Sequence, residues 1–396
     1  MELLSKLLQP IIKNKPIKYS ISSILILSVF ILLMFTGTWG QVVFKPELEP
    51  GPVISLPPSS NETPEPTAEP TPEPTPEPTP DPTPDPGHDG LNPLTGMPMD
   101  EEKVNNRPVA VVLSNEPAAL PMNGVSSADI IFEYQVEGGM TRMLALFQDI
   151  TGVKRVGSIR SARHYTIDFV TSFDAIFVHA GGSPQAYTDL RSRGIDHFDE
   201  VQGRRRDIFF TDRNRIPGRR LEHLHSRVVS DERIEKWFPQ YDLRLEHEED
   251  YDQKLSFVDD GTPLGGSGAA EVIVRYPAKT STFIYNSDNS TYHLVNYRRD
   301  FTDANNNTRA AFTNVIIIRT SVSRIPDDTA DRQNIVTVGS GDGYYINGGK
   351  YIEIKWSREH HDAPYVFTHK DDSPLKLGRG RSFICVVSTR NTIDFS

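Results

Sequence analysis

Proline determines what residues 62–86 of this 396-residue chain can fold into. The segment reads ETPEPTAEPTPEPTPEPTPDPTPDP, so proline returns at nearly every second position. Each proline removes a backbone hydrogen-bond donor and fixes φ, which prevents both helix and sheet. At about 3.1 Å per residue in a polyproline-like conformation, the segment reaches roughly 80 Å. We therefore expect residues 45–90 to be a stiff, disordered stalk; a ligand for a proline-binding partner domain is the alternative.

Residues 19–44, ahead of the stalk, carry no formal charge. Their centre, residues 21–35, reads ISSILILSVFILLMF. A helix that crosses about 30 Å of hydrocarbon at about 1.5 Å per residue needs about 20 apolar residues, so this stretch predicts a transmembrane helix that acts as a signal anchor. The lysines of residues 1–18 should stay in the cytoplasm, which makes the protein single-pass in the cell membrane with the rest of the chain outside. The alternative is a signal peptide cleaved near residues 37–40.

Charge is distributed unevenly along the chain. Residues 46–90 hold ten acidic side chains and no basic one, whereas the whole chain has a net charge of −11. Residues 91–396 are therefore only mildly acidic, which excludes a globally basic nucleic-acid binder. The one cysteine, Cys385, excludes a disulfide framework, a cysteine-rich zinc site and a CxxC redox pair. It also leaves no cysteine near the N-terminus to carry a lipid.

Beyond the stalk, the pattern of apolar residues changes once. Residues 91–260 alternate short apolar runs (VAVVL, IIFEY, MLALF, AIFVH) with two helix candidates, residues 161–173 and 183–193. This alternation indicates a mixed α/β domain. A Gly-, Pro- and Asp-rich stretch at residues 259–268 is the best internal boundary. Strand-like runs then follow one another through residues 269–396, which predicts a β-rich C-terminal domain and an α+β fold for the whole.

The first stretch that could carry chemistry is residues 137–142, EGGMTR. Its adjacent glycines permit a close approach of the backbone to a ligand, and Arg142 offers a planar fork for a carboxylate or phosphate. A bulged hairpin loop with a surface arginine explains the same residues and remains the alternative.

The second stretch, residues 156–164, reads VGSIRSARH and leads into a predicted helix. Ser161 can cap that helix, and the free amides of a helix N-terminus attract anions, which Arg160 and Arg163 would reinforce. Arginines at this end oppose the helix dipole, so something anionic should offset them. The alternative is a pair of arginines that face solvent.

The third stretch, residues 179–184, reads HAGGSP between a strand and a helix. A strand, a glycine loop and a helix N-terminus form the usual ligand-binding place at the carboxyl edge of an α/β sheet. His179 could act as a general acid or base and Ser183 as a nucleophile. The stretch matches neither a nucleophile elbow nor a P-loop, so a helix cap at Ser183 and a hydrogen-bonded histidine at a strand end stay open.

Arginine is concentrated in residues 191–233, which hold eleven arginines interleaved with acidic residues. Solvated ion pairs are the ordinary interpretation of such a pattern. The functional alternative is a patch for an envelope polyanion or a carboxylate-bearing glycopeptide. The histidine pairs at residues 223–225 and 360–362 lack a complete metal-ligand set, so we expect no metal ion and no cofactor.

These stretches define two sets of candidate residues. The candidate ligand-binding residues are Glu137, Gly138, Gly139, Thr141, Arg142, Arg160, Ser161, Arg163, Gly181, Gly182 and Ser183. The candidate acid/base groups are His179, Glu133 and Glu137, with Ser183 as the candidate nucleophile. Convergence of these side chains in one cleft would support a single site.

Several motifs together are similar, in order and spacing, to those of a known family. They are NPLTG at residues 92–96, RPVAV at 107–111, ADIIFE at 128–133, EGGMTR at 137–142, RSAR at 160–163 and HAGGSP at 179–184. On these residues the chain resembles the YerB-like family of bacterial proteins classed as lipoproteins, over roughly residues 91–396. The resemblance implies an N-terminal and a C-terminal domain on a membrane-attached, surface-exposed protein, and it supplies no reaction.

The chain departs from the family pattern in its anchor and in two loops. Family members are commonly attached through a lipid on a cysteine, whereas this chain would use a transmembrane helix and a longer stalk. LPMN at residues 120–123 stands where a more polar Arg-Pro-Gln-type stretch is expected, and Ser158 stands where proline is expected. These differences bear on any ligand contact in those loops.

Three functions remain open from the sequence. The first is a non-catalytic module that binds an anionic or glycopeptide ligand of the cell envelope, or a wall-synthesis protein. The second is an enzyme acting on an envelope polymer, with His179 and Glu133 or Glu137 as acid/base groups. The third is an architectural spacer whose folded head, residues 91–396, oligomerises. We favour the first, because an anchor, a stalk and clustered arginines occur without a recognisable catalytic set.

Overall fold

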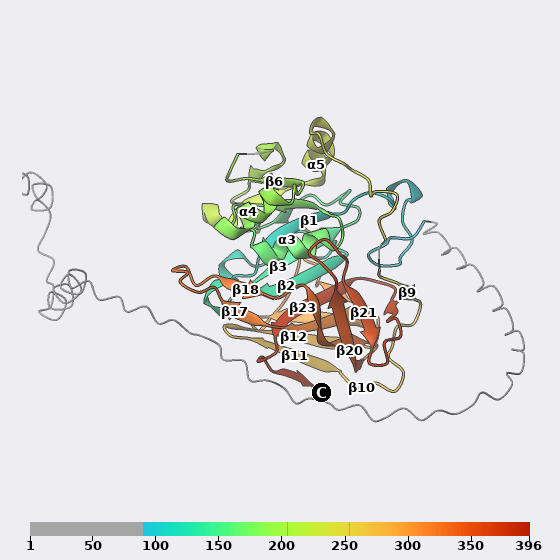
Figure 1. Cartoon of the computed structure of the whole chain (residues 1–396). Helices are drawn as coiled ribbons and strands as arrows, with labels where there is room; N and C mark the ends of the chain where they lie inside the picture. The colour runs from blue at the N-terminus through green and yellow to red at the C-terminus, as the bar shows by residue number, and fades with distance from the viewer. Residues whose placement is uncertain (1–89, 204, 253) are drawn as a thin grey trace, which may run out of the picture. The chain divides into compact units, whose positions relative to one another are not determined.

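The computed structural model of the chain describes residues 90–203, 205–252 and 254–396 (Figure 1). The predicted transmembrane helix, residues 19–44, and all but the last residue of the predicted stalk lie outside the described residues. Within the described part, no helix combines the length and the apolar character needed to cross a membrane. The described residues belong to one compact unit.

A central sheet of eleven strands organises the described residues. Its strand order is β10-β20-β19-β16-β23-β2-β3-β1-β5-β6, with β21 paired to β20. Its strands are β1 (Val109–Ser114), β2 (Ile130–Gln135), β3 (Thr141–Phe147), β5 (Ile176–His179), β6 (His197–Asp199), β10 (Ser267–Gly268), β16 (Asn314–Thr320), β19 (Gly339–Asn347), β20 (Lys350–Arg358), β21 (Val366–His369) and β23 (Ser382–Ser388).

The two sequence parts meet inside this sheet. Strand β23, close to the C-terminus, lies between β16 and β2 and is parallel to both: Ser382 pairs with Asn314 on one side and with Ile130 on the other. The stretch predicted as an internal boundary contains the edge strand β10, which pairs with β20. The α-helices belong to the first part, and the regular elements of residues 269–396 are all strands, but both parts build one sheet.

A second sheet covers one face of the central sheet, and helices α3 (His164–Thr171) and α4 (Pro184–Ser192) pack against the other (Figure 1). The second sheet has the order β14-β13-β12-β11-β24, with β15 paired to β13. Its strands are β11 (Glu271–Tyr276), β12 (Lys279–Asn286), β13 (Thr291–Asn296), β14 (Arg299–Asp300), β15 (Ala311–Phe312) and β24 (Ile393–Phe395). The α-helices of the described part are α3 (His164–Thr171), α4 (Pro184–Ser192) and α5 (Asp231–Trp237).

Short elements complete the described part. The remaining strands are β4 (Val156–Gly157), β7 (Phe210–Thr211), β8 (Arg227–Val229), β9 (Phe257–Val258), β17 (Val322–Arg324), β18 (Gln333–Ile335) and β22 (Leu377–Gly378). Single 3-10 turns lie at Glu101–Lys103, Pro117–Ala119, Glu137–Gly139, Arg206–Ile208, His223–His225 and Phe238–Gln240. Strands β4, β8 and β7 form a small sheet that ties the arginine-rich stretch to the segment before α3.

The unbroken apolar runs of the first part are explained by burial on both faces. Val111 of β1 packs in the apolar cluster that contains Phe283 of the second sheet. Its neighbour Val112 packs in the cluster that contains Phe169 of α3. Because successive side chains of a strand point to opposite faces, a strand covered on both sides must be apolar throughout.

Both helices predicted in the first part are present, but they are shorter than predicted. The first begins at His164, so the prediction that Ser161 caps it is wrong: the backbone of Arg163 is still extended, and the helix starts after it. The second spans Pro184–Ser192. Ser183 caps it, as the alternative to a nucleophilic role predicted: Ser183 Oγ accepts a hydrogen bond from the amide of Ala186 at 3.1 Å.

Strand direction decides which loops meet. Strands β1, β2, β5 and β6 run the same way, and β3 runs against its neighbours β1 and β2. The carboxyl ends of the four strands and the start of β3 therefore lie at one edge of the sheet. The three stretches singled out in the sequence follow β2, precede α3 and follow β5, so this edge is where they are brought together.

Candidate functional site

Backbone hydrogen bonds align the loop before α3 with the ends of β1 and β5. Arg160 N donates to Val112 O at 2.9 Å, and Ala180 N donates to Arg160 O at 3.0 Å. Further along, Ala162 N donates to Gly181 O at 2.9 Å. The loop is thus held like an extra strand between β1 and the glycine loop after β5, and this places its arginines at the edge.

Arg163 and Arg142 converge on Glu137. Arg163 grips the carboxylate with two parallel bonds, Nε to Oε1 at 2.5 Å and Nη2 to Oε2 at 2.7 Å. Arg142 Nη2 lies 3.9 Å from the same carboxylate, and its Nη1 donates to Ser161 O at 2.6 Å. Burial alone would raise the pKa of Glu137, but the hydrogen bonds and charge of Arg163 outweigh it and hold the pKa below its ordinary value.

Arg160 completes a group that we call the arginine edge: Glu116, Glu137, Arg142, Arg160 and Arg163. Arg160 Nη2 donates to the carboxylate of Glu116, while its buried Nε has no hydrogen-bond acceptor among the described residues. Burial, followed by the charge of Arg163, lowers the pKa of Arg142 to about 10. Three guanidinium groups therefore face two carboxylates, which leaves the edge with one positive charge in excess.

The glycines of the EGGMTR stretch serve the chain's own fold. Gly138 and Gly139 have φ of +64° and +70°, backbone angles that residues other than glycine rarely adopt. A Cβ added to Gly139 would lie 2.8 Å from Cβ of Pro277 in the turn between β11 and β12. At Gly139, therefore, the group that approaches the backbone closely is Pro277 of the chain itself, where a ligand was predicted.

His179 and Ser183 lie beneath the edge, without contact to solvent. The His179 ring is fully buried, its Nδ1–H donates to Gly181 O at 2.9 Å, and its Nε2 has no partner among the described residues. Burial lowers the pKa of His179 to about 4, against the opposing charge of Asp199. With Ser183 used as a helix cap, neither side chain is placed to reach a polymer outside the protein.

Glu133 is separated from the arginine edge. It is fully buried on the face of β2 that the second sheet covers, where Lys279 Nζ and Thr141 Oγ1 donate to its Oε1, Thr141 at 2.7 Å. The candidate residues Glu133 and Thr141 thus belong to an internal polar network, whereas Glu137, Arg142, Arg160 and Arg163 meet at the edge.

Sequence reasoning missed Glu116 and Asp199. Glu116 follows β1 at the arginine edge. Asp199 ends β6, and its carboxylate accepts hydrogen bonds from Gly181 N and from Tyr187 Oη, each at 2.8 Å, which fixes the glycine loop. Both follow or end parallel strands, so the rule that carboxyl ends of such strands share one edge could have found them.

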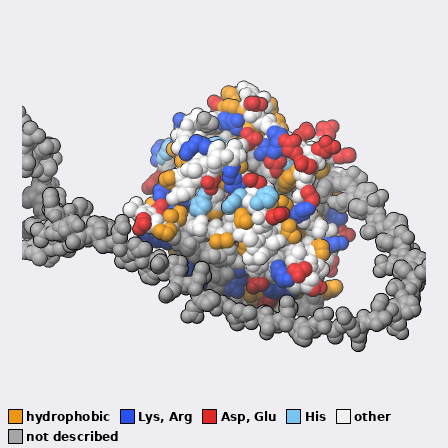
Figure 2. Space-filling view, in the orientation of Figure 1, with side chains coloured by type: hydrophobic (Ala, Val, Ile, Leu, Met, Phe, Trp, Pro, Cys, Tyr) orange, Lys and Arg blue, Asp and Glu red, His pale blue; other side chains and the backbone are white. Residues whose placement is uncertain are grey.

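The arginines of the arginine-rich stretch divide between acidic side chains, as where Arg206 and Arg227 pair with Glu200 at 3.5 and 2.8 Å, and backbone carbonyls. Arg215, which is buried, donates to His225 O and Pro121 O, each at 2.8 Å, and to Ala119 O. Arg219 likewise donates to Ala118 O at 2.6 Å. On the face shown in Figure 2, basic and acidic side chains are interspersed, and no continuous basic field suited to a polyanion is visible.

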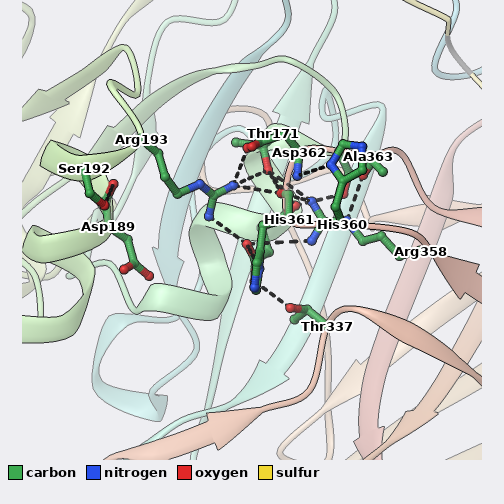
Figure 3. Close-up of polar contacts among 12 residues, drawn as sticks. Thr171, Asp189, Ser192, Arg193, Thr337, Arg358, His360, His361, Asp362 and Ala363 are labelled. Atoms are coloured by element: carbon green, nitrogen blue, oxygen red, sulfur yellow. Dashed lines mark hydrogen bonds and ion pairs between the residues drawn. The ribbon is translucent and has the colours of Figure 1, made fainter.

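The histidines at residues 360–362 belong to a second polar cluster, shown in Figure 3. His361 Nδ1 lies 3.0 Å from Asp168 Oδ1, and Arg193 Nη1 donates to the same oxygen at 2.8 Å. Arg358 reaches the carbonyl of His361, so the cluster ties α3 and α4 to the connection between β20 and β21. Within the described residues, no group of three or more His, Cys, Asp or Glu side chains is arranged to hold a metal ion.

A pocket of about 460 Å³ adjoins this cluster at the opposite edge of the sheet, where β5 and β6 begin. Its lining includes Arg107, Asp174, Arg193 and Arg244. Asp174 is paired with both Arg107 and Arg244, at 3.2 and 2.6 Å, and acidic side chains outnumber basic ones in the lining. The excess of arginine is at the arginine edge and not in this pocket.

Comparisons with known proteins connect this architecture to one group of sequences. Family models described as "Protein of unknown function (DUF3048) N-terminal domain" and "C-terminal domain" match residues 94–239 and 272–384. The chain is 30% identical over 306 residues to "Putative lipoprotein YerB" of Bacillus subtilis (strain 168), which is 77% of this chain and 88% of that protein. The crystal structure of YerB from Bacillus subtilis matches with a TM-score of 0.64 and 27% identity, over 77% of this chain and 99% of that one. The resemblance drawn from the motifs is confirmed, as is the order of a mixed α/β part and a β-rich part.

Proposed function

The chain belongs to the YerB-like family defined by the DUF3048 N-terminal and C-terminal domains, and on this premise we propose that it is a membrane-attached protein of the bacterial envelope whose head binds an anionic ligand. The proposed ligand carries a carboxylate, as the peptide of a cell-wall glycopeptide or an acidic segment of a wall-synthesis protein does. The proposed role is binding without chemical change of the ligand.

One observation carries this proposal: three arginines, one from β3 and two from the loop before α3, meet two carboxylates at the carboxyl edge of the sheet. An arginine fork matches a carboxylate with two parallel hydrogen bonds. Arg163 already makes that contact with Glu137, whereas Arg160 makes a single contact with Glu116 and keeps a buried Nε without an acceptor. Arg160 is therefore the side chain that a ligand carboxylate would engage, with Arg142 beside it.

Attachment is proposed through residues 19–44 as a single transmembrane helix, with residues 45–90 holding the head away from the membrane. This rests on the uncharged apolar run and on the position of the only cysteine of the printed sequence, Cys385, which is buried in β23 and cannot carry a surface lipid. Resistance of the protein to alkaline extraction from membranes, together with an N-terminal peptide that includes residues 1–18, is the expected result. Loss of that peptide from the mature protein would show a cleaved signal peptide instead.

The enzyme alternative gains no support from the geometry. His179 and Glu133 are fully buried and lie in different networks, and Glu137 is held by Arg163 as an ion pair. An acid/base pair must reach the reacting atoms within hydrogen-bond distance, directly or through one water.

Binding is tested by co-sedimentation of the full chain, in detergent, with isolated cell-wall sacculi, with and without their anionic polymers. Replacing Arg160→Gln should weaken retention roughly 10- to 100-fold, because one charge-assisted hydrogen bond is worth about 1.5–3 kcal/mol. The matched control is Arg275→Gln on β11, where the side chain is half-exposed and paired with the exposed Asp394.

Each outcome of this experiment has a definite meaning. Equal retention of both variants would overturn the assignment of the ligand to the arginine edge. Mass spectrometry of the soluble fraction covers the enzyme alternative: new glycopeptide fragments that vanish with His179→Ala would replace binding by catalysis. If the wild-type chain is not retained at all, the cell wall is not the ligand. The acidic segment of a wall-synthesis protein is then the proposed ligand to test next.

A further inference from the structure

A group of polar side chains around Glu133 lies in the core, between the central sheet and the second sheet. We call it the Glu133 cluster: Asn115, Glu133, Lys279, Ser281 and Asn296. All five are buried, and Lys279, at 5%, is the most exposed of them. A lysine is almost never fully buried unless it is paired, so its presence here asks for an explanation.

The cluster brings an amine and a side-chain amide to the same carboxylate oxygen. Lys279 Nζ donates to Glu133 Oε1, and Asn115 Nδ2 donates to that oxygen at 2.8 Å. The Lys279 amine and the Asn115 amide are therefore separated by one shared acceptor. The second oxygen of Glu133 accepts a hydrogen bond from Ser281 Oγ at 2.7 Å, which fixes the plane of the carboxylate.

The carbonyl of Asn115 has a donor of its own. Asn296 Nδ2 donates to Asn115 Oδ1 at 2.6 Å, and Tyr297 Oη holds the Asn115 main chain through its carbonyl oxygen at 2.9 Å. A donor on this oxygen polarises the amide and would stabilise negative charge that develops there during attack on Cγ. The electrophile is thus held in place and activated by neighbours that are already bonded to it.

The surroundings favour a neutral, nucleophilic amine. Burial lowers the pKa of Lys279, although the charge of Glu133 opposes the shift. The aromatic rings of Tyr276 and Tyr297 each lie 5.9 Å from Nζ and exclude water from the cluster. Reacting groups held together in a dry site are converted from a bimolecular to an effectively unimolecular encounter, the condition under which an unactivated amide can react.

From this geometry we propose that Lys279 and Asn115 are joined by an isopeptide bond formed by the folded chain itself. Nζ of Lys279 attacks Cγ of Asn115, the new Nζ–Cγ bond forms, and the Cγ–Nδ2 bond breaks. Glu133 accepts a proton from Nζ and passes it to Nδ2, which leaves as ammonia. The balance is one amine and one primary amide giving one secondary amide and one ammonia, with no change of oxidation state and no co-reactant.

The bond would connect the two sequence parts. Asn115 directly follows β1, and Lys279 begins β12, so the link would tie the central sheet to the second sheet. The chain has only one cysteine and cannot form an internal disulfide. A covalent amide would give the head a cross-link that no reducing agent opens.

Trypsin digestion of the purified full chain provides a direct test. The segment from Val104 to Arg142 is one tryptic peptide, because Arg107 precedes a proline, and it contains both Asn115 and Glu133. A modified Lys279 also blocks cleavage after itself. The expected product is residues 104–142 joined to residues 276–298, lighter than the sum of the two peptides by one ammonia.

Substitutions at the cluster separate the proposal from its alternatives. Glu133→Gln should abolish the joined peptide, whereas the control Ser127→Ala, at an exposed position of the same tryptic peptide, should retain it. Asn115→Asp should give a joined peptide identical in mass to the wild-type product, because water leaves in place of ammonia. Circular dichroism of each variant verifies that it is folded.

Two results would overturn the proposal. Recovery of the separate peptides 276–279 and 280–298 from folded wild-type protein would show that Lys279 and Glu133 remain an unreacted buried ion pair. A joined wild-type peptide that has lost water in place of ammonia would show an amide between Lys279 and Glu133.

Discussion

The buried histidine beneath the arginine edge should make the stability of the head depend on pH. The ordinary pKa of histidine is 6.5, and burial lowers that of His179 to about 4. Between these values the unfolded chain binds a proton that the folded chain does not bind. Stability contributed by the neutral ring is therefore fully present above pH 6.5 and is lost as the pH falls toward about 4.

The size of this effect follows from the shift. A difference of about 2.5 pKa units at about 1.36 kcal/mol per unit gives about 3 kcal/mol, and the ring is fully buried, so solvent screening takes little from it. Typical domains have only about 5–15 kcal/mol of stability in total. A single histidine should thus account for a large share of any acid sensitivity of the head.

The informative variant is His179→Asn. An asparagine amide can donate to Gly181 O as Nδ1 of the histidine does, but it does not titrate. Urea unfolding of both proteins, followed by the fluorescence of Trp237 and Trp356 at several pH values between 7.5 and 4, gives the difference in unfolding free energy. Carboxylates other than Asp199, which lies 3.8 Å from His179 Nδ1, contribute equally to both proteins and cancel in that difference.

We expect the variant to be the less stable protein at pH 7.5, because a smaller side chain leaves a cavity. This deficit should shrink, or reverse, by about 3 kcal/mol as the pH falls to about 4. A difference that stays constant over the whole range would refute the reasoning, since it would mean that His179 gains its proton equally in the folded and unfolded chain.

Two further predictions concern the loops around the site. Arg215→Met should lower the unfolding free energy by about 3–5 kcal/mol, because it leaves several buried carbonyls without a donor. The control Arg220→Met, on an exposed arginine, should change the unfolding free energy by less than about 0.5 kcal/mol. Similar midpoints of thermal unfolding for the two variants would contradict the role given to Arg215. Gly138→Ala should lower the unfolding free energy by about 1–2 kcal/mol, because its backbone is left-handed. Gly139→Ala should lower it clearly more, because only the Cβ added at Gly139 meets Pro277. Equal decreases for the two variants in denaturant unfolding would show that the turn containing Pro277 moves aside.

The strands of the first part could be predicted from sequence, because their signal is local. The run at residues 109–113 is strand β1, and the run at 175–179 is strand β5, with boundaries within a residue. Convergence of the loop segments was also within reach, because parallel strands place their carboxyl ends together. These inferences need only the pattern of apolar residues and a rule of topology.

The partners of the charged residues could not be predicted, because they depend on segments far apart in the chain. Glu133 is a candidate base in the sequence, but in the structure it is paired with Lys279 of the second part. Arg160 and Arg163 are three residues apart, yet one pairs with Glu116 and the other with Glu137. The pattern of the arginine-rich stretch indicates solvated ion pairs, with a surface patch as the alternative, and the backbone carbonyls to which Arg215 donates have no signature in the sequence.

The place of β23 in the middle of the central sheet sets the timing of folding. One neighbour of β2 in the sheet comes from residues 382–388, which are synthesised long after β2 itself. At a synthesis rate of about 5–20 residues per second, that neighbour follows β2 after on the order of 10–50 s. Until then, the backbone amides and carbonyls along one edge of β2 remain unpaired. The first part cannot be completed while the rest is still being made, so a chain that stops before β23 is left with an open sheet edge ready to pair with another molecule.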